Sequence, residues 1–280
     1  MKKLPINGDL VGLETDPITH SWTDRDVMLY ALGVGCRPPD DLDFLYEGRG
    51  PKVLPTFAVI PGLRAMGSSM QRIDINLAAL LHGEQSVVVH RPLPASAAVT
   101  VSGRIANVWD KGKAAVIVFE GSATDDSGPL FDVMASLFVL GGGGWGGERG
   151  PSGSPGAAAP DREPDIVVER ETRPEQAAIY RLSGDMNPMH IDPDFATMAG
   201  FPGPFNHGLC TFGIVGHSVL SAWCGGDVGR FGSISGRFAD QVWPGDTIVT
   251  RLWDLGDEAV VEARTQRGNT VISSGRATRR

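Results

Sequence analysis

The chain has 280 residues, with 41% hydrophobic and 21% charged side chains and a formal net charge of −8 at pH 7. This composition predicts a soluble globular protein with enough apolar surface for one large core or two ordinary ones. The acidic charge is spread along the chain and argues against nucleic-acid binding, although a few arginines can still hold an anionic ligand. No run approaches about 18 apolar residues, so no membrane span is expected.

The first residues and the cysteines indicate a cellular compartment. Lys2 and Lys3 are not followed by the apolar core of a secretory signal, and the last residues carry no peroxisomal address. Cys36, Cys210 and Cys224 are odd in number and lack metal-ligand spacing. We therefore expect reduced thiols in a cytoplasmic protein.

Two segments of the chain look like diverged copies of one unit. Identical residues recur at one constant offset, and the matching pairs are Tyr30 and Tyr180, Leu32 and Leu182, Pro94 and Pro244, Val99 and Val249, and Thr100 and Thr250. Each copy holds one apolar segment suited to a buried helix, at 56–66 and at 208–223.

Alternating apolar strands, broken by a polar turn, follow the apolar segment in each copy. They lie at 114–121 and 131–140 in the first copy, and at 259–265 and 270–277 in the second. A single buried helix followed by long antiparallel strands is an α+β pattern. We expect the two units to join into one larger sheet, which would cover their edge strands.

A segment rich in glycine, proline and serine, residues 141–165, separates the copies. A phosphate-binding glycine loop would need a following Gly-Lys-Ser/Thr and a strand–loop–helix context, and neither is present. The segment is predicted to be a flexible, exposed linker. It divides the chain into a unit at 1–140 that lacks a catalytic motif and a unit at 166–280 that carries one.

The most informative segment, YRLSGDMNPMHIDP, concentrates a carboxylate, an amide and an imidazole in Asp185, Asn187 and His190. Gly184 and Pro188 break any helix here, so the three side chains are expected on a fixed loop. Each residue taken singly is commonly structural, as a turn former or a hydrogen-bonded histidine. Their combination favours catalysis.

Asp192 and Pro193 are better explained by structure than by chemistry. Asp192 has the character of an N-cap, and Pro193 that of the first residue of a short helix. Asp185, His190, Asp192 and His207 can also be drawn as metal ligands. They lack the paired spacing of zinc sites, such as His-x-x-x-His, so neither a metal nor a cofactor is expected.

The two copies differ in their polar groups. Asp185 and His207 of the second copy stand where the first copy has Gly35 and Phe57. We interpret this as duplication followed by loss of chemistry in the first copy. The loss would leave room there for a bulky substrate.

A second apolar helix begins near Gly208, where free backbone N–H groups and a partial positive charge favour a developing oxyanion. Gly208 equally suits close packing of a helix on a strand, and the sequence does not separate these readings. His207 either caps this helix or lines a pocket. Cys210, inside the helix, is predicted to be core.

With these residues assembled, the chain resembles the MaoC-like dehydratases, specifically the (R)-specific enoyl-CoA hydratase 2 group. The resemblance is carried by 180–196 and 207–213, and it extends into the first half through 30–35, 42–48, 53–62 and 80–83. It implies two fused hot-dog domains, each an antiparallel sheet wrapped around a central helix. It also implies a homodimer.

The activity that the resemblance implies is reversible addition of water to trans-2-enoyl-CoA, giving (R)-3-hydroxyacyl-CoA by acid–base catalysis. By position, Asp185 and His190 become the catalytic pair, Asn187 a supporting polar group and Gly208 the oxyanion donor. The substrate-binding positions are His207, Phe205, Asn206, His82 and Gly83. Where relatives commonly read Pro-Ile-Leu-His-Gly, this chain has Phe205 and Asn206 before the histidine, which puts its acyl preference in doubt.

Three alternatives stay open at this point. A hot-dog thioesterase would use a carboxylate near the helix start to hydrolyse the same thioester. A dehydratase could act on acyl carrier protein thioesters in place of CoA. A non-enzymatic acyl-CoA binder would suit the first copy but not the second.

Overall fold

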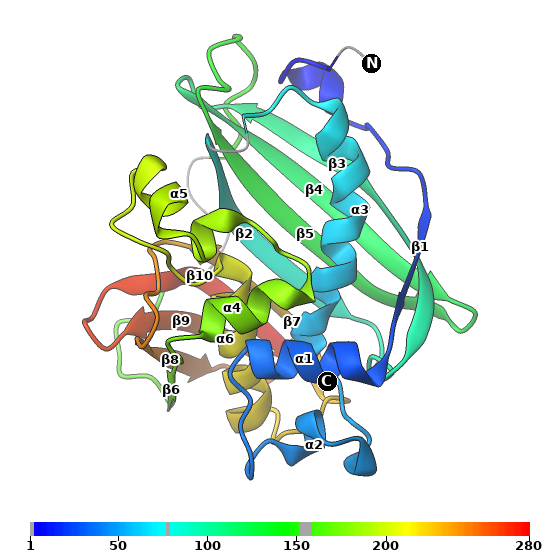
Figure 1. Ribbon diagram of the computed structural model, residues 1–280, viewed down its shortest axis with the longest axis vertical. Coiled ribbons are helices and arrows are strands. Elements are labelled where there is room, and N and C mark those ends of the chain that lie inside the picture. Colours follow the sequence, from blue (N-terminus) through cyan, green and yellow to red (C-terminus); the bar gives the residue numbers. More distant parts are fainter. Residues whose placement is uncertain (1–2, 77–78, 152–157) are drawn as a thin grey trace.

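One antiparallel sheet of ten strands runs through the molecule (Figure 1), in the order β1-β3-β4-β5-β2-β7-β10-β9-β8-β6. The computed structural model describes residues 3–76, 79–151 and 158–280. The strands of the first half are Ile18–Trp22 (β1), Leu80–Val89 (β2), Ala97–Asp110 (β3), Ala114–Asp125 (β4) and Gly128–Leu140 (β5). Those of the second half are Ile166–Glu171 (β6), Phe231–Phe238 (β7), Thr247–Asp254 (β8), Glu258–Thr265 (β9) and Thr270–Arg279 (β10).

The two halves of the sheet meet where β2 pairs antiparallel with β7, with Val87 opposite Ile234. Side chains alternate between the two faces along each strand, so one face is buried while the other is partly exposed. The predicted joining of two units into one sheet is therefore confirmed.

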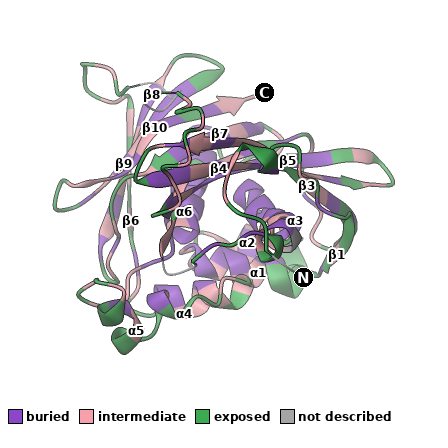
Figure 2. Cartoon of the chain, turned by 90° about the horizontal axis from the view of Figure 1, so that it is seen from above, coloured by how far each residue is buried: buried purple, intermediate pink, exposed green. Residues whose placement is uncertain are grey.

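Two long helices cover the buried face of the sheet, and Figure 2 shows both on the same side. Helix α3, Val59–Arg72, follows a 3-10 turn at Pro55–Ala58 and packs on β3 and β4. Helix α6, Gly208–Ala222, packs on β6 and β8 and is buried along nearly its whole length. A helix held against each half of an antiparallel sheet is the predicted double hot-dog, α+β fold, which is thus confirmed.

Four shorter helices close the other side of α3 and α6 (Figures 1 and 2). They are Asp24–Gly33 (α1), Leu42–Leu45 (α2), Gln176–Tyr180 (α4) and Pro193–Met198 (α5). The predicted cap is present, because the Asp192 carboxylate accepts hydrogen bonds from the N–H groups of Asp194 and Phe195 at 2.9 and 3.2 Å. Within the described residues, no helix is both long and apolar enough to cross a bilayer.

The repeated tyrosines lie against each other at the centre of the molecule. Tyr30 and Tyr180 are fully buried, and their ring centroids are 6.0 Å apart. A Cβ on Gly33 would approach the Tyr180 Cα to 3.1 Å, so α1 and α4 make backbone-close contact. The two copies therefore share one core.

The start of the segment 141–165 is tied to the sheet by hydrogen bonds to Asp110. The carboxylate of Asp110 accepts hydrogen bonds from the N–H groups of Gly144 and Gly146 at 2.8 and 2.7 Å. It accepts two more from Gly112 and Gly147. These bonds lower the pKa of Asp110 to about 2. The first part of the segment is therefore anchored, while 152–157 lie outside the described residues.

Candidate active site

The bend that follows α4, residues 181–190, and the start of α6 bring together the side chains of Asp185, His190 and His207. One possible ligand atom from each of these side chains lies within 4.8 Å of the others. The bend is fixed locally: Asp185 Oδ1 accepts the Asn187 N–H at 3.2 Å, and Asn187 Oδ1 accepts the Met189 N–H at 3.1 Å. The Asn187 amide thus caps the short 3-10 turn that ends at His190.

His190 is oriented by Phe205. Its Nδ1 lies 2.8 Å from the Phe205 carbonyl oxygen, and its ring meets the Phe205 ring edge-on with centroids 5.0 Å apart. Because a carbonyl only accepts, Nδ1 carries the proton, and Nε2 of the neutral ring is left as an acceptor. Burial lowers the pKa of His190, against the opposing effect of the Asp185 charge.

His207 lies behind His190. It occupies the N-cap position of α6, but its side chain makes no bond to the helix. Its Nε2 donates instead to the backbone carbonyl of Asp185 at 3.1 Å, and the ring is 1% exposed. Burial, followed by the charge of His190, lowers the pKa of His207 to about 3. His207 was predicted either to cap the helix or to line a pocket. In the structure its side chain does neither, and it is buried in contact with His190 and Asp185.

A cavity of about 530 Å³ opens beside the bend. Its wall includes Asp185 and His190, together with apolar side chains from the first copy: Leu63, Met66 and Met70 of α3, and Leu80 and Leu81 of β2. The polar groups of the second copy therefore face a cavity to which both copies contribute apolar side chains. The predicted residues on this wall are Asp185, Asn187, His190, Phe205, Asn206, Gly208, His82 and Gly83.

Gly208 and Asn206 flank the start of α6 at the cavity. Gly208 is the first residue of the helix, and a Cβ there would meet the Phe238 ring at 3.3 Å. Close packing of helix on strand therefore accounts for this glycine, and its N–H still lies in the first turn, where no intrahelical acceptor exists. Asn206 is 2% exposed, and neither its Nδ2 nor its Oδ1 has a partner among the described residues.

His82 and Gly83 bring β2 to the cavity at a β-bulge, where the register with β5 shifts. His82 Nε2 donates to the Glu84 carbonyl at 3.1 Å, and burial lowers the pKa of His82 to about 4. A Cβ on Gly83 would lie 2.8 Å from Ser136 Oγ. Both residues thus have structural contacts besides their place on the wall.

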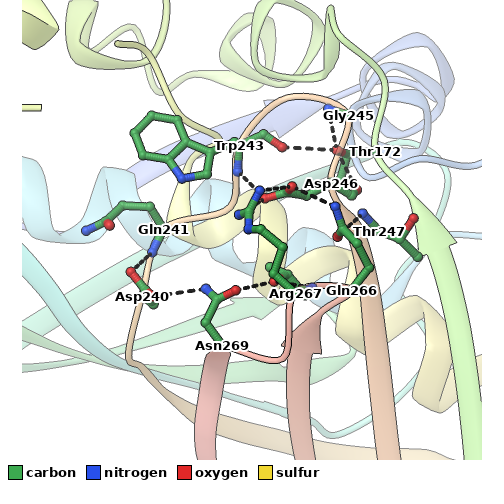
Figure 3. A network of polar contacts seen from close by, with 11 residues as sticks. Thr172, Asp240, Gln241, Trp243, Gly245, Asp246, Thr247, Gln266, Arg267 and Asn269 are labelled. Carbon is green, nitrogen blue, oxygen red and sulfur yellow. Dashed lines mark hydrogen bonds and ion pairs between the residues drawn. The ribbon is translucent and has the colours of Figure 1, made fainter. Parts of the chain in front are cut away.

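The loop between β7 and β8 forms a wall that the sequence did not reveal. Its residues Asp240, Gln241 and Val242 line the cavity. Figure 3 shows how the loop is held: Asp246 receives a bidentate pair of bonds from Arg267, at 2.7 and 2.6 Å, and the Trp243 N–H at 2.8 Å. The local sequence of this loop resembles no site motif. The loop reaches the cavity because of the path of its backbone, which contacts with Arg267 and Trp243 hold in place.

The three cysteines are buried and free. Burial raises the pKa of the Cys210 thiol, as expected for a core residue and not a nucleophile.

Comparison with known proteins is consistent with this geometry. The chain matches the MFE-2 hydratase 2 N-terminal domain over residues 20–141 and the MaoC like domain over residues 156–275. It is 39% identical to enoyl-CoA hydratase ChsH3 of Mycobacterium tuberculosis, over 97% of this chain and 98% of that protein. It is 44% identical to 3-hydroxyacyl-thioester dehydratase Y of the same organism, over 89% and 88%.

Among solved structures, a MaoC-like dehydratase from Phytophthora capsici superposes with a TM-score of 0.87 at 33% identity, covering 99% of this chain and 98% of that one. The fold and the site thus define a double hot-dog protein with its polar groups in the second half. The chain belongs to the MaoC-like dehydratase family, in the group with a hydratase 2 N-terminal domain.

Proposed function

We propose that the protein is an (R)-specific 2-enoyl-CoA hydratase, a hydro-lyase that reversibly adds water to trans-2-enoyl-CoA thioesters. The observation that carries this proposal is the pairing of Asp185 with His190, on one bend and within 4.8 Å, beside an apolar cavity. The names of the relatives, enoyl-CoA hydratase and 3-hydroxyacyl-thioester dehydratase, support it.

The proposed reaction is acid–base chemistry on one water molecule. Asp185 and His190 hold the water, one of them takes its proton as the oxygen bonds to C3, and the pair returns a proton to C2 on the same face. Water is thereby added across the double bond without a cofactor. Each proton-transfer group typically supplies roughly 10²–10⁴-fold in rate. We assign the two proton transfers to the pair as a unit and not to either residue singly.

The thioester oxygen would be stabilised at the start of α6. We propose that the Gly208 N–H donates to this oxygen as negative charge develops, an effect worth about 10²–10³-fold for one donor. The apolar side chains of α3 and β2 would hold the acyl group. This proposal predicts that a bulky enoyl-CoA is a better substrate than a short one.

The test compares the wild-type protein with the variants Asp185→Asn and His190→Gln in the hydration of crotonyl-CoA. The loss of the enoyl absorbance measures the rate. Both variants should lose activity while circular dichroism and the thermal midpoint show a folded protein. Asp192→Asn is the matched control, because asparagine keeps the helix cap and should keep the activity. Full activity of either site variant would remove the proposal.

The same assay separates the alternatives. Release of free thiol without loss of the enoyl absorbance would identify a thioesterase. Faster turnover of enoyl thioesters of acyl carrier protein than of enoyl-CoA would identify a dehydratase that uses this carrier protein. An (R)-specific and an (S)-specific 3-hydroxyacyl-CoA dehydrogenase, used in parallel, would report the configuration of the product. We further propose a cytoplasmic homodimer, and light scattering on a sizing column tests the dimer.

A further inference from the structure

The active-site bend and the start of α6 together assemble a set of side chains that suits a metal ion. Asp185, His190 and His207 offer a carboxylate and two imidazoles, each with one candidate ligand atom within 4.8 Å of the others. This donor set is one that divalent transition metals bind in proteins. Sequence spacing did not reveal it, because the third member comes from a different segment. Asp192 was the fourth possible metal ligand in the sequence, but its carboxylate caps helix α5.

Both imidazoles are already held as metal-binding histidines usually are. Each donates one ring N–H to a backbone carbonyl, His190 to Phe205 at 2.8 Å and His207 to Asp185 at 3.1 Å. Such a bond fixes the tautomer and leaves the other nitrogen free to bind a metal. Nδ1 of His207 is buried and has no partner among the described residues. An orphaned nitrogen in a buried ring is costly unless something binds it.

We propose that Asp185, His190 and His207 bind one divalent transition-metal ion, such as Zn²⁺, and that the bound ion inhibits the enzyme. Ligands on a tetrahedral zinc lie roughly 3.3 Å apart for bonds of about 2.0–2.1 Å, so small side-chain rotations must draw the three atoms together. Asp185 and His190 face the cavity, which leaves a fourth position for water. The ion occupies the proton-transfer atoms of both residues, so they can no longer move a proton.

A second cluster of similar composition provides the internal control. Cys36, Asp41 and His217 also lie within 4.8 Å of one another. Here both ring nitrogens face partners: His217 Nε2 is 3.1 Å from Asp41 Oδ1, and Nδ1 is 3.6 Å from Cys36 Sγ. The positive charge of Arg170 acts on Asp41 as well. This cluster is therefore a closed polar network, and it is not expected to take the ion.

The experiment is titration of the purified full-length protein with ZnCl₂ by isothermal calorimetry, in the absence of any substrate. Asp185→Asn and His207→Gln should each lower the zinc affinity by at least about 10-fold. Cys36→Ser and Asp192→Asn should leave it unchanged. Circular dichroism verifies the fold of each variant, and two independent site variants guard against the misfolding of one. Unchanged affinity in both site variants, or loss of binding in Cys36→Ser, would overturn the proposal.

The inhibitory consequence rests on the proposed hydratase activity, whereas the binding does not. Saturating Zn²⁺ should lower the rate of crotonyl-CoA hydration at least about 10-fold, and EDTA should restore it. A zinc ion bound at this cluster with no effect on the rate would overturn the inhibition. A protein without hydratase activity, but with zinc binding that depends on Asp185 and His207, would contradict the proposed function alone.

Discussion

The imidazole rings of His190 and His207 lie with their centroids 3.9 Å apart and their planes inclined by 36°. The two residues come from different segments, the bend after α4 and the start of α6, and the contact joins those segments. His207 also donates to the Asp185 carbonyl, so it touches both members of the proposed catalytic pair. Its low pKa keeps it neutral, and a neutral ring can support His190 without repelling its protonated form.

His207 is therefore predicted to be a positioning residue. His207→Ala should lower kcat by about 10-fold or more, because misplacing reacting groups is costly, while KM changes little. His207→Gln keeps an amide donor for the Asp185 carbonyl and should recover part of kcat. Steady-state kinetics on crotonyl-CoA gives the two parameters separately. A rise in KM with unchanged kcat would indicate substrate binding instead.

Burial of His190 gives a prediction for pH dependence. Its pKa is lowered, so the neutral ring, with Nε2 as acceptor, persists below the usual histidine range near 6.5. The limb of the kcat/KM profile that His190 sets should therefore have its midpoint below about 6.5. A profile of kcat/KM against pH checks this, with unfolding followed at each pH to exclude acid denaturation. A midpoint above that value would contradict burial as the dominant effect on the pKa of His190.

Much of the fold could be predicted from the sequence because strands, turns and helix caps are specified by residues that are close together in the chain. Period-two alternation with polar turns gave β4, β5, β9 and β10, and the Asp192-Pro193 pair gave the start of α5. The predicted difference in polar groups between the two copies is visible in the structure. Phe57, which takes the place of His207 in the first copy, packs edge-on against Tyr30 with ring centroids 5.5 Å apart. An apolar ring there fills the core and carries no chemistry.

The parts that were not predictable depend on contacts between distant segments. The position of His207 behind His190 needs the course of both segments at once. Anchoring of the linker depends on Asp110, a strand residue well before it. The cavity-lining side chains of α3 carry no sequence feature that separates them from ordinary core residues. In each case, the deciding partner lies far away in the sequence.

The linker anchor predicts a local effect of Asp110→Asn. Asparagine has about the same size but no charge, so the four backbone N–H groups would lose a charged acceptor, which is stronger than a neutral one. The thermal midpoint should fall, and limited proteolysis should cut within 141–150 more rapidly. Hydration of crotonyl-CoA should not change in the folded variant. Equal proteolysis rates in both proteins would show that the anchor contributes nothing.

Two helical glycines give opposite predictions for the same substitution. A Cβ on Gly213 of α6 would lie 2.4 Å from Val34 Cγ1, whereas one on Gly67 of α3 would meet nothing within 4 Å. Gly213→Ala should therefore reduce the free energy of unfolding by about 1–3 kcal/mol through overpacking. Gly67→Ala should raise it by up to about 1 kcal/mol, because alanine favours the helix. Urea unfolding of both variants measures the difference, and stabilisation by Gly213→Ala would contradict the close approach.

Asn206 gives the last prediction, because its buried amide has no partner among the described residues. A buried polar group left unsatisfied costs about 1–3 kcal/mol, so Asn206→Leu, of similar size, should raise the free energy of unfolding by about that amount. Asn187→Leu is the matched contrast: it removes the bond to the Met189 N–H and should destabilise the bend. Asn206 lines the cavity, so the leucine should also improve kcat/KM for long apolar enoyl-CoAs relative to crotonyl-CoA. If Asn206→Leu lowers stability, the amide has a partner in solution, such as an ordered water, and the apolar replacement loses that bond.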